Sequence, residues 1–184
     1  MRETSKTRSM ILCSIFAALT AVGAFIRIPM PYFDYITLQT TFVLLAGMLL
    51  GARRGAIALL VYVLIGLSGI PLFAGGGGFT YVLRASFGFL IGFILGAGMT
   101  GLLTEAVPNP GYLRLFLAGL SGLVVVYTCG ILYRYFIMNY YLDTPLSLGI
   151  IFAACLPVEI PKDILVCAAT AYFAKKIRPR LIRN

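Results

Sequence analysis

Residues 112–138 read YLRLFLAGLSGLVVVYTCGILYRYFIM, and no charged residue lies between Arg114 and Arg134. About 20 apolar residues allow a helix to cross the ~30 Å hydrocarbon core of a bilayer, so this stretch predicts a membrane-spanning helix. Breakers and charges divide the rest of the chain into further apolar segments of the same kind. We therefore predict an all-α integral membrane protein with six transmembrane helices, in a single domain over residues 1–184. The other five segments are approximately 9–28, 36–50, 55–70, 81–104 and 149–175.

The composition excludes most classes of soluble protein. Of 184 residues, 60% are hydrophobic and 11% are charged, with a mean hydropathy of +0.97, whereas a soluble domain carries about 25% charged residues. The sequence has no histidine and only six Asp and Glu residues, so the commonest general base and most metal-ligand sets are missing. The four cysteines stand singly in apolar runs, where we expect small buried side chains. Catalytic residues, a metal and a cofactor are not expected.

The basic residues predict the orientation in the membrane. Of the 15 Lys and Arg residues, 11 fall on one face if both termini lie on the same side, and the positive-inside rule makes that face cytoplasmic. The net charge of +9 then reflects topology and attraction to an anionic lipid bilayer rather than nucleic-acid binding. The first apolar run is too long for a cleavable signal peptide and is expected to be retained. The 11 residues are Arg2, Lys6, Arg8, Arg53, Arg54, Arg114, Lys175, Lys176, Arg178, Arg180 and Arg183.

A few ionisable residues lie within the predicted spans, where an unpaired charge is costly and marks a candidate functional site. Arg84 lies near the outer end of the fourth segment, and Glu159, Lys162 and Asp163 lie in the sixth. All four belong to the outer half of the predicted topology, from which a solute would enter. The alternative is that they form a structural ion-pair cluster or extend to the interface.

The same regions contain the two most irregular stretches of backbone. The run Gly75-Gly76-Gly77-Gly78 allows backbone amides to approach a ligand, and a flexible outer turn is the alternative. No Lys-Ser/Thr pair follows the run, so it is not a P-loop. Pro157 and Pro161 remove two helical N–H donors and are expected to bend or interrupt the sixth segment. Interrupted helices recur at the binding sites of transporters.

The loop after the first segment supplies further candidates. Gln39 places an amide just inside the second segment, where it needs a partner. Tyr35 in this loop and Tyr81 at the start of the fourth segment are aromatic; anchoring at the membrane interface is the alternative account for aromatic residues of the loop. With the charged residues and the glycine run, these side chains predict an aromatic-lined pocket for a small, mainly apolar solute with a few hydrogen-bonding groups.

One face of the first segment consists of small residues, which let another helix approach closely. Ala17 and Ala21 form an AxxxA pattern on this face. The face can contact a partner protein, or it can pack against the chain's own helices. Its members are Ser14, Ala17, Ala18, Ala21 and Ala24.

Five motifs, taken in their order and spacing, resemble the BioY family, the biotin-specific substrate-binding components of energy-coupling-factor (ECF) transporters. The resemblance covers essentially the whole chain. The motifs are ITLQT (36–40), LLGARRGA (49–56), YVLIGLSGIPLFAGGGG (62–78), FGFLIGF (87–93) and PKDIL (161–165).

The resemblance implies a multi-pass protein of the cell membrane with cytoplasmic termini, which captures biotin at the outer face and has no ATPase or other enzyme activity. It also implies a partner module with a transmembrane coupling protein and two ATPases, reached through Ala17 and Ala21. Biotin carries a ureido ring and a carboxylate. We expect Asp163 to accept a hydrogen bond from the ureido N–H, and Gln39, Lys162 or Arg84 to donate to the carbonyl or to the carboxylate.

The chain departs from the family pattern in two places. The late motif usually reads Pro-Gly-Asp with a Lys three residues after the Asp, whereas here Lys162 replaces the Gly and Val166 stands in place of the Lys. The family's Gly-Pro-Thr-Gly-Gly-Tyr run is replaced by LRASFGF at residues 83–89, which makes Arg84 a candidate substitute cation.

Two other functions are weighed against this one. A self-sufficient small-solute transporter usually shows inverted repeats, and the two halves of this sequence show no convincing self-similarity. A membrane-embedded hydrolase would need Lys162 beside a serine, and Ser86 is the candidate in the outer half.

Overall fold

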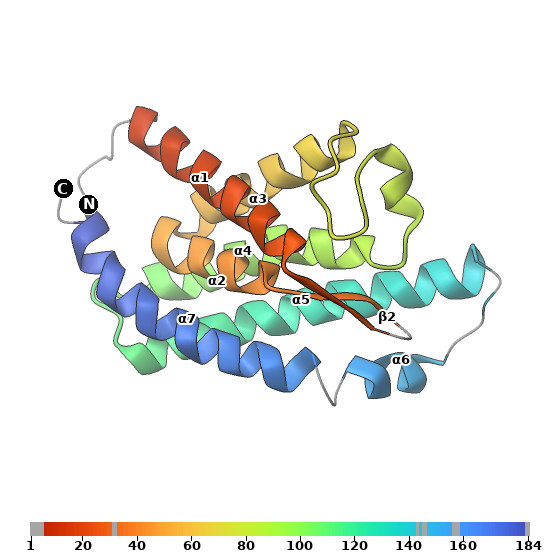
Figure 1. Cartoon of the computed structure of the whole chain (residues 1–184). Helices are drawn as coiled ribbons and strands as arrows, with labels where there is room; N and C mark the ends of the chain where they lie inside the picture. The colour runs from red at the N-terminus through yellow and green to blue at the C-terminus, as the bar shows by residue number, and fades with distance from the viewer. Residues whose placement is uncertain (1–5, 31–32, 143, 145–146, 156–158, 183–184) are drawn as a thin grey trace.

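The computed structural model describes residues 6–30, 33–142, 144, 147–155 and 159–182 (Figure 1). In chain order, these residues form α1 (Lys6–Phe25), β1 (Arg27–Met30), β2 (Phe33–Thr37), α2 (Gln39–Leu50), α3 (Ala52–Leu67), the 3-10 helix η1 (Phe79–Leu83), α4 (Phe87–Glu105), α5 (Tyr112–Tyr140), α6 (Leu148–Cys155) and α7 (Glu159–Ile182). By length and composition, α1, α4 and α5 can cross a membrane, and α2 is a shorter apolar helix. The prediction of a helical fold is confirmed.

Apolar side chains cover the outside of the bundle as well as its core. Leu113, Val124 and Leu165 are 66%, 66% and 72% exposed, as expected for surfaces that face lipid. Between helices in lipid, close packing replaces the hydrophobic effect as the main attraction. An added Cβ at Gly92 of α4 would lie 2.8 Å from the carbonyl oxygen of Val126 in α5. The two helices therefore pack backbone against backbone.

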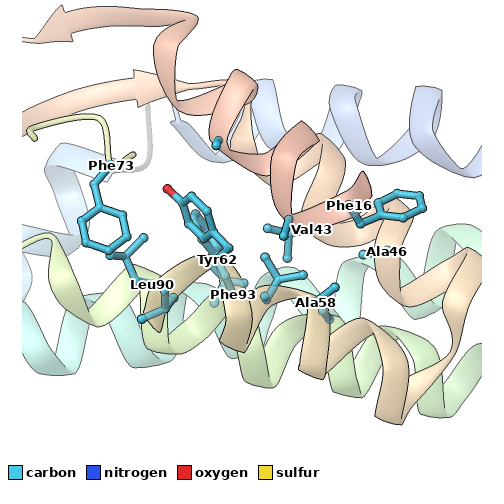
Figure 2. Close-up of a cluster of buried hydrophobic side chains, with 14 of the residues drawn as sticks. Phe16, Val43, Ala46, Ala58, Tyr62, Phe73, Leu90 and Phe93 are labelled. Atoms are coloured by element: carbon cyan, nitrogen blue, oxygen red, sulfur yellow. The ribbon is translucent and has the colours of Figure 1, made fainter. Parts of the chain in front are cut away.

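A cluster of buried side chains joins α1 to α4 and reaches the loop after α3 (Figure 2). The rings of Tyr62 and Phe73 meet edge to face with centroids 5.5 Å apart, and Phe73 lies 4.6 Å from the ring of Tyr81. Such aromatic contacts stabilise beyond the area they bury. Phe73 thereby fixes the glycine-rich loop and η1 to the bundle.

The two ends of the bundle differ in character. α1 begins and α7 ends at one end of the molecule, whereas the hairpin and the loop after α3 lie toward the other (Figure 1). At the first end, the carboxylate of Glu105 accepts a 3.2 Å hydrogen bond from the Ala52 N–H, and Arg178 donates to the Met48 carbonyl at 3.4 Å. These bonds connect the α2–α3 turn with the ends of α4 and α7.

The connection between α1 and α2 contains a hairpin that the sequence did not predict. β1 and β2 pair antiparallel, with Arg27 opposite Thr37 and Ile28 opposite Ile36. The predicted first helix, 9–28, therefore ends at Phe25, because the chain enters β1 there and pairs with β2, which is rich in aromatic and β-branched residues. The amide of Leu38 donates to the carbonyl of Ile26 at 3.3 Å, which connects the end of α1 to the start of α2.

Two of the predicted helices are divided. The fourth, 81–104, is interrupted because Arg84 is extended (φ −82°, ψ 142°), so α4 begins only at Phe87. The sixth, 149–175, is split into α6 and α7, as an interruption by prolines predicts. Pro157 lies outside the described residues, and Pro161 lies in the first turn of α7, where the missing N–H costs no intrahelical bond.

Candidate functional site

A chamber of about 90 Å³ lies between β2, α2, α4, α5 and the start of α7. Its wall is aromatic and aliphatic, with two acids, two bases and one amide among its lining residues. Half of the predicted site residues meet there, namely Tyr35, Gln39, Tyr81, Lys162 and Asp163. Glu159, an ionisable candidate from the sequence, also lines the chamber. Lining residues that the sequence did not suggest for the site include Thr40, Phe93, Tyr127 and Arg134.

Asp163 lies in the first turns of α7 and is 5% exposed. Its Oδ2 accepts hydrogen bonds from the hydroxyls of Tyr127, at 2.8 Å, and Thr40, at 3.4 Å. Its Oδ1 lies 2.9 Å from Nζ of Lys162, yet receives no hydrogen bond of good geometry from any residue that the structure describes. A buried carboxylate oxygen without a hydrogen bond is costly, so Oδ1 is an acceptor that a ligand in the chamber can use.

Lys162 joins α7 to the end of the hairpin. Besides its ion pair with Asp163, its ammonium donates a 3.2 Å hydrogen bond to the carbonyl oxygen of Thr37. The side chain is 29% exposed, so part of the ammonium remains accessible. The structural ion pair that the sequence left open as an alternative is thus present between these two residues, and both of them line the chamber.

Gln39 is held by the protein on both sides of its amide. Its Nε2 donates to the hydroxyl of Tyr62 at 2.7 Å, and its Oε1 accepts from the hydroxyl of Thr37 at 3.1 Å. Tyr62 in turn donates to the carbonyl of Leu72 at 3.2 Å. An amide nitrogen carries two N–H donors, so one donor of Gln39 remains for the chamber.

The second cation of the chamber is Arg134. The predicted orientation assigns Arg134 to the outer face, and it was not predicted as a site residue. Arg134 lies on α5 and is 7% exposed. Its position within the apolar run 112–138 could have indicated a functional role, because a guanidinium within a membrane span has a high free-energy cost. Arg84, the cation predicted instead, is exposed and lies outside this chamber.

Arg84, Gly75 and Gly76 line a second, outer cavity of about 350 Å³. Tyr35 lines both cavities. The two spaces are therefore neighbours. Eight of the ten predicted site residues line one or both of them, whereas Gly77 and Gly78 line neither.

The glycine run forms a tight turn that uses two of its own amides. The Gly76 N–H donates to the Phe73 carbonyl at 3.0 Å, and the Gly78 N–H donates to the Gly66 carbonyl at 2.8 Å. Gly76 and Gly78 have φ values of 118° and 97°, which side chains rarely adopt. An added Cβ at Gly77 would overlap the carbonyl of Ile70. Thus the amides of Gly76 and Gly78 already donate within the protein and are not free for a ligand. The prediction that backbone amides of this run approach a ligand does not hold for these two glycines.

The small-residue face of α1 is divided between the inside and the outside. Ala17 and Ala21 are both 7% exposed and belong to the core that α1 shares with α2 and α3. This is the internal packing that the sequence left open as an alternative. Ser14 and Ala18 lie on the exposed side of the same helix.

The family model that describes the BioY family matches residues 1–183 of this chain. The chain belongs to the BioY family. Similar members include a probable biotin transporter BioY of Lysinibacillus sphaericus, 41% identical over 177 residues, which cover 96% of this chain and 90% of that protein. The biotin transporter BioY of Thermotoga maritima is 35% identical over 172 residues, which cover 92% of this chain and 97% of that protein.

The fold of this BioY-family chain is similar to that of a solved S-component for biotin from an ECF-type ABC transporter. The TM-score is 0.83 at 22% sequence identity, over 97% of this chain and 95% of that chain. The likeness supports a helical integral membrane protein. The family resemblance predicted from the sequence is confirmed, and the relatives are named as transporters, in agreement with the prediction that the chain is not an enzyme.

Lys162 marks where this BioY-family chain departs from the late family motif. In the structure the displaced cation still lies beside Asp163, at 2.9 Å. Val166, in the place of the usual Lys, is half-buried one helical turn farther along α7. The departure therefore keeps a cation at the carboxylate, and this cation also contacts the end of the hairpin at Thr37.

Proposed function

We infer that this chain is a multi-pass protein of the cell membrane that captures biotin at the outer face and delivers it through an ATP-driven ECF module. The module comprises a transmembrane coupling protein and two ATPases. Family membership and the biotin-transporter names of the relatives support this function. The observation that carries it to particular residues is the buried Oδ1 of Asp163.

The ureido ring of biotin offers two N–H donors and one carbonyl acceptor. Asp163 Oδ1 is the acceptor for a ureido N–H, because Oδ2 is already occupied by Tyr127 and Thr40. Hydrogen bonds to charged groups contribute about 1.5–3 kcal/mol each when water is excluded. The carboxylate is thus the principal polar contact of the bound ring.

The ureido carbonyl needs a donor on the same side of the chamber. Lys162 has three N–H donors. One is directed to the Thr37 carbonyl, and the ammonium charge pairs with Asp163. A remaining N–H of Lys162, together with the remaining donor of Gln39, is suited to the carbonyl oxygen. The rings of Tyr81, Phe93 and Tyr127, which line the chamber, cover the apolar faces of the bicycle.

Six helices cross the membrane in this account, namely α1 to α5 and α7, with both termini in the cytoplasm. The exposed apolar side chains of the bundle and the gathering of basic segments at the end where α1 begins support this orientation. α2 has 12 residues, about 18 Å at 1.5 Å per residue. It is shorter than the ~30 Å hydrocarbon core, so its ends are covered by neighbouring helices and loops.

Contact with the coupling protein uses the exposed small residues of α1. Ser14 and Ala18 are one helical turn apart and lie on the exposed side, where a partner helix can approach closely. Ala17 and Ala21, buried in the chain's own core, support that face from within.

Co-purification tests the function directly. The chain, purified in detergent from cells grown with biotin, should release biotin on denaturation, identified by its mass. Uptake of radiolabelled biotin into biotin-depleted cells should require co-expression of the ATPases and the coupling protein. Release of another compound would contradict biotin as substrate, and uptake by the chain alone would favour a self-sufficient transporter.

A further inference from the structure

Two guanidinium groups line the outer cavity. It is lined by Arg27 from β1 and Arg84 from the segment after η1, together with aromatic residues and the turn at Gly75. Among the described residues, no acidic side chain lines it. It is therefore a positively charged space on the outer side of the chamber.

Each arginine lies over the ring of a tyrosine. Cζ of Arg27 is 4.7 Å from the centroid of Tyr35, and Cζ of Arg84 is 5.3 Å from the centroid of Tyr81. Cation–π contacts of this length are favourable, and in them the guanidinium lies over the face of the aromatic ring. The N–H groups around its edge remain available, and within the described part of the chain neither guanidinium has a side-chain hydrogen bond or ion pair.

Both tyrosines also line the inner chamber. Tyr35 and Tyr81 therefore form part of the chamber wall, while each also lies against one arginine of the outer cavity. The inner chamber measures about 90 Å³ and the outer cavity about 350 Å³, whereas ligand pockets usually enclose about 300–1,000 Å³. A solute whose polar ring is fixed at Asp163 must thus extend past the tyrosines toward the arginines.

We propose that the outer cavity is a carboxylate-binding subsite, in which Arg27 and Arg84 hold the carboxylate of a solute whose ring occupies the inner chamber. This inference rests on the proposed function, and it assigns the valerate carboxylate of biotin to this pair of arginines. A guanidinium presents a planar fork of donors that matches a carboxylate in a bidentate arrangement. The positive cavity also attracts anionic solutes from the outer solution.

The proposal separates the two ends of the ligand, so analogues altered at one end test it. Biotinamide keeps the ureido ring and replaces the carboxylate with a neutral amide. Equilibrium competition against radiolabelled biotin, on the whole chain in nanodiscs, should show that the protein binds biotin roughly 10- to 100-fold more tightly than biotinamide. The difference should shrink at high salt, because screening weakens an exposed charge–charge contact.

The variants Arg27→Gln and Arg84→Gln should lower affinity for biotin while leaving that for biotinamide within about twofold, and the double variant should abolish the preference. Arg27→Lys and Arg84→Lys, which keep the charge, should retain part of it. Lys175→Gln removes a charge at the opposite end of α7 and serves as the control. Melting temperature in detergent reports whether a variant remains folded.

The outcomes separate this inference from the proposed function. Equal affinity of the unaltered chain for biotin and biotinamide would overturn the subsite and leave biotin capture standing. Parallel losses of both affinities in folded Gln variants would also overturn it, because the arginines would then act only by supporting the two tyrosines. Failure to bind either compound would overturn both proposals.

Discussion

The Tyr127 hydroxyl donates a 2.8 Å hydrogen bond to Oδ2 of Asp163, across the contact between α5 and α7. The Thr40 hydroxyl from α2 approaches the same oxygen at 3.4 Å. Two donors on one oxygen fix the carboxylate in a single orientation. Oδ1 is thereby left as the oxygen available to a solute, so Tyr127 contributes to binding through the acid it holds as well as through its ring.

Tyr127→Phe tests this relationship. The change keeps the ring and removes the hydroxyl, so biotin affinity should fall roughly 10-fold, the value of one hydrogen bond to a charged group. Calorimetry on the purified chain measures it. Tyr140→Phe, at a tyrosine that is 75% exposed, should have no effect. An unchanged affinity in Tyr127→Phe would show that the carboxylate needs no support from α5.

Lys162→Met should weaken biotin binding by about 5- to 150-fold, because the buried Asp163 carboxylate loses its cation and the hairpin loses a contact. The apolar stem of the side chain is retained. Adding Val166→Lys restores a cation in the position usual for the family, three residues after the acid and on the same side of the helix. Affinity should then recover in part. No recovery in a folded double variant would indicate that the Thr37 contact is the more important function of Lys162.

Gly77→Ala and Gly75→Ala form a matched pair in the glycine run. The added methyl at Gly77 would overlap the backbone carbonyl of Ile70, whereas at Gly75 it would meet the end of the long Arg84 side chain, which has several rotatable bonds. We therefore expect Gly77→Ala to lower the melting temperature by several degrees and Gly75→Ala to leave it almost unchanged. Thermal unfolding in detergent measures both. Equal melting temperatures would show that the turn adapts to a side chain at either position.

Ala18→Trp and Ala17→Trp distinguish the outer face of α1 from its inner face. Ala18 is exposed and Ala17 is buried. Ala18→Trp should keep biotin affinity and melting temperature while preventing co-purification with the coupling protein. Ala17→Trp should lower stability, because overpacking a core costs about 1–3 kcal/mol. Normal assembly of Ala18→Trp would show that the partner contacts another surface.

The sequence predicted the helical membrane fold because long uncharged runs constrain the chain strongly. It could not predict the hairpin at Arg27–Thr37, since the apolar residues there fit either a helix end or a short strand. It also could not separate η1 from α4, because the interruption depends on the extended backbone at Arg84 and on the tertiary packing of Tyr81.

The sequence predicted only part of the candidate site, because local patterns identify some of its residues and not others. Lys162 and Asp163 were found because charges within a span are rare. Arg134 was missed because its position near the end of an apolar run is equally consistent with the interface. The cation–π contact of Arg27 with Tyr35 arises only when β1 and β2 pair. A hydrogen bond such as that between Tyr127 and Asp163 joins residues far apart in the chain, which no local pattern reveals.

Calorimetric titration of biotin into purified Asp163→Asn tests whether Asp163 receives the ureido ring of biotin. The substitution preserves the shape of the side chain and replaces an acceptor with a donor. Affinity should fall about 5- to 150-fold, as expected for an unpaired buried partner, with the melting temperature near that of the unaltered chain. Glu105→Gln, at the other end of the bundle, should bind biotin normally. Unchanged biotin binding by Asp163→Asn would show that Asp163 does not receive the ureido ring.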